Sequence, residues 1–170
     1  TKKTMFEGSS ILAFYGLLYL SQKYKNVALP FTKKYKYIEI NNLNETQIMF
    51  HCNTNKARYS VRKDFKLIFP VKNTLGGDTG EANFFKRIKK FEGDSTKDFV
   101  LCYIFISHDC KYISAHANML IINLKTKEIE RFEPHGKKNI GARNPQPIYN
   151  QLDRILSKIS KQNGYKYITP

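Results

Sequence analysis

The sequence predicts an α+β fold with a central, mostly antiparallel sheet flanked by helices. Residues 147–164 carry apolar side chains at helical spacing, and Gly164 is placed to end that helix. Residues 98–107 are a nearly continuous apolar run rich in β-branched and aromatic residues, which is typical of a central strand buried on both faces. Helices and strands occur in blocks rather than in strict alternation, and this order favours α+β.

The N-terminal half predicts a helix, a hairpin and one more short strand. Residues 11–20 (ILAFYGLLYL) are typical of a buried helix that begins at Ser9 or Ser10. Three β-rich runs then predict a hairpin and a strand that ends in proline: residues 34–40, 46–52 and 64–70. A loop-like stretch at residues 73–83 follows.

The C-terminal half predicts a short basic helix, the central strand, a second hairpin and the long helix, at residues 81–91, 98–107, 114–136 and 147–164. Residues 165–170 resemble the start of another strand. We expect the core to include seven apolar residues: Leu12, Leu17, Phe99, Leu101, Ile104, Leu120 and Ile122.

Composition indicates a globular, basic protein. The chain has 170 residues, 41% hydrophobic and 14% aromatic, which is enough for one domain with a real core. Lysine and arginine number 29 against 14 aspartate and glutamate, a net charge of +15. This excess indicates attraction to polyanions such as nucleic acid, an acidic protein or an anionic surface. A solvated, lysine-rich surface with no such partner is the alternative.

Cysteine spacing favours a reducing compartment, and hydropathy predicts no transmembrane segment. Cys52, Cys102 and Cys110 show no paired spacing, which favours a reducing compartment over a disulfide framework. The apolar run at residues 11–20 is far shorter than the roughly 20 residues that a transmembrane helix needs. The chain begins at Thr1 and stops in a strand-like segment, so we expect residues 1–170 to be a single domain, the N-terminal part of a longer polypeptide.

The second hairpin contains the most informative pair of residues. If its turn has two residues, Leu124 and Lys125, then Asn123 lies opposite Thr126 and His116 lies opposite Glu133. A carboxylate that accepts from one imidazole nitrogen leaves the other nitrogen free to act as a general base. An exposed cross-strand ion pair is the simpler alternative.

The string HANMLIINLKTKEIERFEPHG resembles the catalytic strands of the adenain-like and SUMO-protease-like cysteine peptidases, and also proteins of large DNA viruses. The matching features are a His that opens a hydrophobic strand, a short basic turn, and an acid just after an aromatic residue. Here these features are His116, Phe132 and Glu133. The resemblance implies that His116 is the general base and Glu133 the acid that orients it.

The resemblance also implies a cysteine nucleophile some tens of residues after the acid, at the start of a helix. Residues 134–170 contain no cysteine, so the nucleophile is expected beyond Pro170, or the chain is a non-catalytic relative. Cys110, six residues before His116, is an alternative nucleophile. The pairs His51–Cys52 and His108–Cys110 could hold zinc if their loops met. The glycine-rich residues 76–80 lack a phosphate-binding signature, and His135 is expected to be exposed.

These observations favour a cysteine-peptidase-fold protein of a large DNA virus that cleaves polypeptides or ubiquitin-like conjugates, without cofactor or metal. Its expected locations are the host cytoplasm and the virion. The alternative is a non-catalytic virion or assembly protein whose basic surface binds nucleic acid or acidic partners.

Overall fold

The computed structural model describes residues 10–30, 47–54, 63–68, 80–108, 116–133 and 146–170. It contains three helices and seven strands within these ranges, in the order α1 (Ser10–Lys23), β1 (Val27–Ala28), β2 (Gln47–Thr54), β3 (Lys63–Ile68), α2 (Gly80–Glu92), β4 (Phe99–His108), β5 (His116–Asn123), β6 (Glu128–Phe132), α3 (Gln146–Gln162) and β7 (Lys166–Ile168). The predicted α+β class is confirmed.

The strands form one mixed sheet in the order β3-β2-β4-β5-β6-β7, and β1 also pairs with β4. β1 lies beside the start of β4 and β2 beside its later residues, from Tyr103 to His108. Three of the six pairings are antiparallel (β2–β3, β4–β5 and β5–β6) and three are parallel (β1–β4, β2–β4 and β6–β7). The sheet is therefore mixed, although antiparallel pairings cover more residue pairs than parallel ones do.

A helical connection explains one of the parallel pairings. β6 is joined to β7 through α3. A crossover that contains a helix returns the chain in its original direction, so the strand that follows can pair in parallel.

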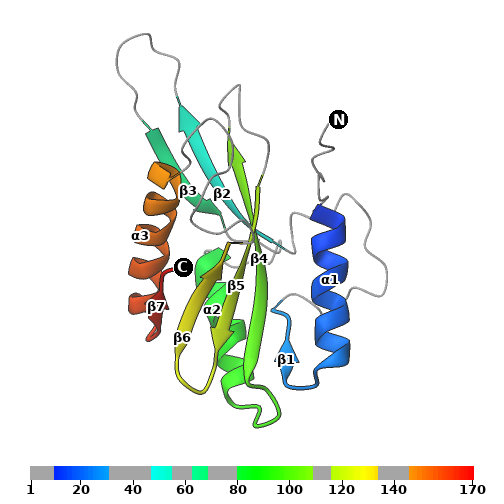
Figure 1. Ribbon diagram of the computed structural model, residues 1–170. Helices are drawn as coiled ribbons and strands as arrows, with labels where there is room; N and C mark the ends of the chain where they lie inside the picture. Colours follow the sequence, from blue (N-terminus) through cyan, green and yellow to red (C-terminus); the bar gives the residue numbers. More distant parts are fainter. Residues whose placement is uncertain (1–9, 31–46, 55–62, 69–79, 109–115, 134–145) are drawn as a thin grey trace, which may run out of the picture.

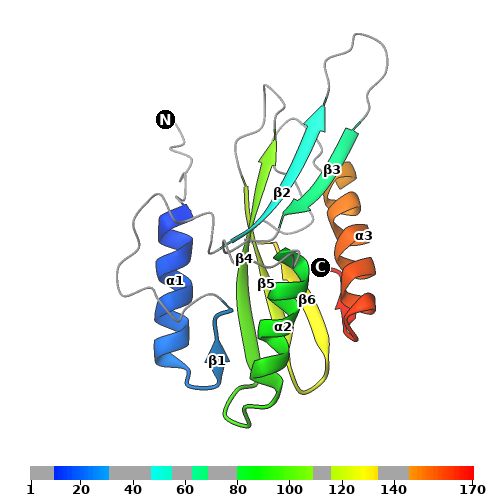
Figure 2. The same ribbon diagram turned by 180° about the vertical axis from the view of Figure 1, so that it is seen from behind.

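Helices cover both faces of the sheet (Figures 1 and 2). α2 and α3 lie on one face, over the main core that includes Ile88, Leu152 and Leu156. α1 lies on the other face, where Leu17 packs in a smaller cluster with Leu29, Leu101 and Tyr103. The predicted place of β4 is confirmed, because it has β5 on one side and β1 and β2 on the other.

The predicted core residues are mostly buried. Leu17, Leu101, Ile104, Leu120 and Ile122 are all less than 8% exposed. Phe99 is only half-buried because it is the first residue of β4, at the end of the sheet. The side chain of Leu12, and the strand expected at residues 34–40, lie outside what the structure describes. Of the run predicted at residues 46–52, residues 47–52 belong to β2, whose antiparallel partner is β3.

α3 ends as the sequence predicts. Gly164 has a φ of +83°, the left-handed conformation that a helix C-terminus requires. The amide of Tyr165 donates to the carbonyl of Ser160, and the amide of Gly164 donates to that of Lys161. These two bonds form a Schellman motif that directs the chain into β7. Within the described ranges, no helix has the length and apolar character to cross a bilayer.

Candidate functional site

The β5–β6 hairpin pairs in a different register from the one expected. Asn123 lies opposite Glu128, and Met119 lies opposite Phe132. The connecting turn therefore has four residues instead of two. In this register, the position opposite Glu133 is Asn118 rather than His116, so the predicted direct pairing of His116 with Glu133 is wrong.

The turn itself explains the change of register. The side-chain oxygen of Asn123 accepts hydrogen bonds from the amides of Lys125 and Thr126, at 3.0 and 3.1 Å. Lys127 then adopts a φ of 55°, which redirects the chain into β6. Leu124 is buried in the main core, and its amide donates to the carbonyl of Asp98. An Asn at the first position of a turn is a recognisable signal for this geometry.

The register shift leaves the predicted face unchanged. Because the shift moves the partner by two residues, position 116 and Glu133 still share one face of the sheet. Asn118, Leu120 and Ile122 lie on that face and are buried, as predicted. The backbone of His116 is paired with Ile106 on β4; the imidazole lies outside the described part of the structure. Diagonal neighbours in a sheet are roughly 7–8 Å apart, within reach of long side chains.

Glu133 is held firmly at the end of β6. It is 8% exposed and accepts a hydrogen bond of 2.8 Å from the side-chain amide of Asn118. One nitrogen of Arg131 lies 3.8 Å from the same carboxylate oxygen. The side-chain oxygen of Asn118 in turn accepts a hydrogen bond from Arg131. Asn118 therefore bridges Glu133 and Arg131, and it fixes the position of the carboxylate.

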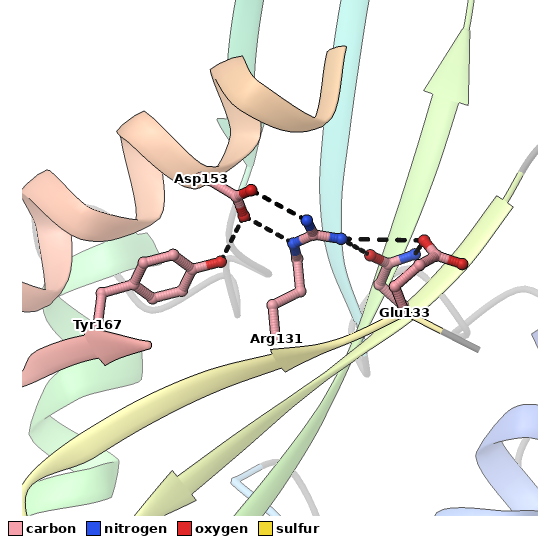
Figure 3. Close-up of polar contacts among 5 residues, drawn as sticks. Arg131, Glu133, Asp153 and Tyr167 are labelled. Carbon is pink, nitrogen blue, oxygen red and sulfur yellow. Dashed lines mark hydrogen bonds and ion pairs between the residues drawn. The ribbon is translucent and has the colours of Figure 1, made fainter. Parts of the chain in front are cut away.

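Arg131 is the centre of a buried polar cluster (Figure 3). Its guanidinium forms a bidentate pair with Asp153 of α3, with nitrogen–oxygen distances of 2.8 and 3.0 Å. The hydroxyl of Tyr167 on β7 donates to the same carboxylate at 2.6 Å. The guanidinium also lies over the ring of Tyr149, 5.0 Å from its centroid. The cluster joins β6 to α3 and β7.

The electrostatics of the cluster follow from its burial. Burial alone would lower the pKa of Arg131, but the hydrogen bonds and charge of Asp153 outweigh it and raise that pKa. Burial, followed by the charge and hydrogen bond of Glu133, raises the pKa of Tyr149. Burial, followed by the hydrogen bond and charge of Asp153, raises the pKa of Tyr167. Both tyrosines therefore stay neutral and donate to carboxylates near neutral pH.

Two carboxylates of the cluster share the guanidinium of Arg131. Asp153 lies against it at 2.8 Å, whereas Glu133 is further away, at 3.8 Å. An imidazolium at position 116 has the sign that this pair of carboxylates favours.

The structure also places the cysteines that the sequence analysis considered. Cys102 is 1% exposed in the middle of β4, and burial raises its pKa well above the ordinary range, so this thiol is a core residue as expected. The backbone of Cys52 lies opposite that of His108, so β2 and β4 do meet there. The side chains of that proposed zinc set, and the whole of Cys110, lie outside the described residues, as does His135.

Sequence reasoning missed most of the cluster. It placed Asn118 on the correct face but assigned it no role, and it overlooked Arg131, Asp153, Tyr149 and Tyr167. One signal was available: Arg131 is two residues after Ile129, so both side chains lie on the inward face of β6, where an unpaired cation would be unstable. Nothing in the sequence identified Asp153 as its partner, because that pairing depends on how α3 crosses the sheet.

Comparison with known proteins does not identify a family. No family model matches the chain, and neither a curated protein nor a solved structure shows significant similarity to it.

Proposed function

We propose that this chain carries the general base and the orienting acid of a cysteine-peptidase-like site, with His116 as the base and Glu133 as the acid. The observation that carries the proposal is the β5–β6 register. In this register Glu133 lies opposite Asn118, which is two residues from position 116 on β5, so Glu133 and position 116 share one face of the sheet. Asn118 holds the carboxylate of Glu133 through a hydrogen bond.

The surroundings of Glu133 support this role. An orienting acid must keep a fixed position and stay ionised while the imidazole gains and loses a proton. Hydrogen bonding from Asn118 meets the first requirement. The guanidinium of Arg131, 3.8 Å from the carboxylate, favours its ionised form and supports the second. An exposed cross-strand ion pair, the alternative, would not require a carboxylate that is 8% exposed.

The nucleophile of this proposal lies in sequence beyond Pro170. Within the described residues the free thiol is that of Cys102, and it is too deeply buried to act as a nucleophile. The substrate class is a polypeptide, either a viral precursor or a ubiquitin-like conjugate. The virion and the host cytoplasm are the proposed locations. These assignments rest on the resemblance of residues 116–136.

A titration of this chain tests the proposed pair directly. The pKa of His116, followed by NMR of its ring, should be lower in Glu133→Gln than in the parent, because a nearby negative charge has been removed. Glu130→Gln is the matched control, since it makes the same charge change on an exposed residue of β6. The same His116 pKa in all three proteins would overturn the proposed pair.

An activity assay tests the reaction. In a form that includes the residues encoded after Pro170, His116→Ala should abolish cleavage of polypeptide substrates. Glu133→Gln should reduce cleavage less, because the base remains while its orientation weakens. Replacing His51 by Ala should leave the rate unchanged. A reading frame that stops at Pro170, or a His116→Ala variant with parental activity, would refute the peptidase assignment.

A further inference from the structure

Four connections gather at one end of the molecule, away from the tips of β2 and β3 (Figures 1 and 2). They are the links α1–β1, α2–β4, β5–β6 and α3–β7. Hydrogen bonds join these links to one another. The amide of Asp98 donates to the carbonyl of Asn26, the amide of Leu124 to that of Asp98, and the amide of Lys166 to that of Lys127.

This end, which we call the basic pole, has a large excess of lysine. Ten lysines lie on its four connections and the adjoining helix ends: Lys23, Lys25, Lys89, Lys90, Lys97, Lys125, Lys127, Lys158, Lys161 and Lys166. The same segments contain four acidic residues: Glu92, Asp94, Asp98 and Glu128. The pole therefore has six more positive charges than negative charges.

Three of the acids are already paired. Asp98 binds Lys125 at 2.7 Å, Glu92 binds Lys127 at 2.6 Å, and Glu128 lies 3.6 Å from Lys166. Six other lysines of the pole are exposed and make no ion pair with a described residue: Lys23, Lys25, Lys89, Lys90, Lys158 and Lys161. Exposed cations without an ionic partner at several places on the pole are available to an external polyanion.

Two exposed aromatic rings border the pole. Tyr19 is 59% exposed and Tyr24 is 46% exposed, both at the C-terminal end of α1. The ammonium of Lys23 lies 5.6 Å from the ring centroid of Tyr19 and 5.3 Å from that of Tyr24. Open aromatic faces beside cations are what proteins use to bind single-stranded nucleic acid, through base stacking and phosphate contacts.

We propose that the basic pole binds single-stranded nucleic acid, with lysines on the phosphates and bases stacked on Tyr19 and Tyr24. The inference goes beyond the proposed peptidase site, which lies at the other end of the hairpin. Seven residue steps separate Asn123, next to the turn, from His116, which is roughly 23 Å along a strand. A strand bound at the pole would therefore leave that site open.

The chemistry of the pole predicts how it binds. Lysine contacts phosphate as a mobile point charge, so binding should depend little on base sequence. Six contacts to a single strand would give a slope of log affinity against log salt of roughly −4, from about 0.7 per phosphate.

The first experiment measures anisotropy of a labelled oligothymidylate of about 20 nucleotides at several salt concentrations. Lys90→Gln/Lys161→Gln should weaken binding and reduce the salt slope by roughly 1.4, because two phosphate contacts are lost. The matched control, Lys86→Gln/Arg154→Gln, removes two exposed charges from the same two helices, further from the pole. Equal losses in both variants, or no binding at low salt, would refute the assignment of the pole.

A second experiment tests the aromatic part. Tyr24→Ala should lower affinity for the single strand several-fold and leave affinity for heparin unchanged, because heparin has no bases to stack. Tyr15→Ala is the control, since Tyr15 is 56% exposed on α1 but lies further from the pole. Unchanged single-strand binding in Tyr24→Ala, or equal affinity for duplex and single strand, would show a general polyanion site and overturn the assignment to single strands.

Discussion

At the scale of single residues, Arg131 has the greatest influence on the C-terminal half of the molecule. Its side chain is 4% exposed and contacts the carboxylates of Glu133 and Asp153 and the side-chain amide of Asn118, which come from three different segments. The sequence could predict that Glu133 and position 116 share a face, because strand alternation depends only on local geometry. It could not predict the Arg131 cluster, because those contacts depend on where a distant helix docks.

Arg131→Met should be strongly destabilising. Removing the cation leaves the partly buried carboxylate of Asp153 and the buried carboxylate of Glu133 without the guanidinium, and breaking a buried pair costs about 3–5 kcal/mol of unfolding free energy. Urea denaturation measures the loss. Lys166→Met, at an exposed pair with 72% side-chain exposure, should cost less than about 1 kcal/mol. The double variant Arg131→Met/Asp153→Leu should recover part of the stability, and no recovery would contradict the importance of this pair.

At the scale of elements, helices were predicted well and strand register was not. Helix limits follow from local signals such as Gly164, and α2 and α3 lie within two residues of their expected positions. The register of β5 and β6 depended on the turn, where Asn123 and Lys127 create two additional loop positions. A two-residue error in register moved the partner of Glu133 but kept its face, since strand alternation has a period of two.

Two glycines should respond in opposite ways to the same substitution. Gly16 is exposed within α1 with no atom near an added Cβ, so Gly16→Ala should stabilise the protein by about 1 kcal/mol. Gly164 also has space, but its φ of +83° disfavours a side chain, and Gly164→Ala should cost about 1–2 kcal/mol. Thermal unfolding followed by circular dichroism distinguishes them; shifts of the same sign would contradict this account.

At the scale of the whole molecule, the layers and the central strand were predictable and the strand directions were not. Apolar character identified β4, because a strand covered on both faces must be apolar throughout. Strand direction depends on which strands the helical connections join, and that information is not local. Among the residues that the structure describes, four tyrosines on both sides of the sheet have raised pKa values: Tyr103, Tyr149, Tyr165 and Tyr167.

These tyrosines predict a loss of stability at alkaline pH. Burial raises the pKa of Tyr103 to about 12, against about 10 in an unfolded chain. A tyrosine with a raised folded pKa contributes stability that is complete below about pH 10 and is lost as pH rises toward the folded value. Urea denaturation between pH 8 and 12 should show this decline, and Tyr103→Phe should reduce it. Tyr15→Phe, at an exposed position, should not; equal effects would contradict the prediction.

The polar cluster around Arg131 has a consequence for how the chain could be divided into two fragments. Asp153 and Tyr167 both lie in residues 146–170, whereas Arg131 and its hairpin lie before residue 134. Leu152 and Leu156 of the later segment also pack into the main core. A cut between residues 134 and 145 would thus give two fragments with complementary surfaces, one with a buried cation and one with its carboxylate. Such fragments should reassociate when mixed, with β7 pairing again to β6, so the C-terminal 25 residues could be exchanged, labelled or supplied in trans.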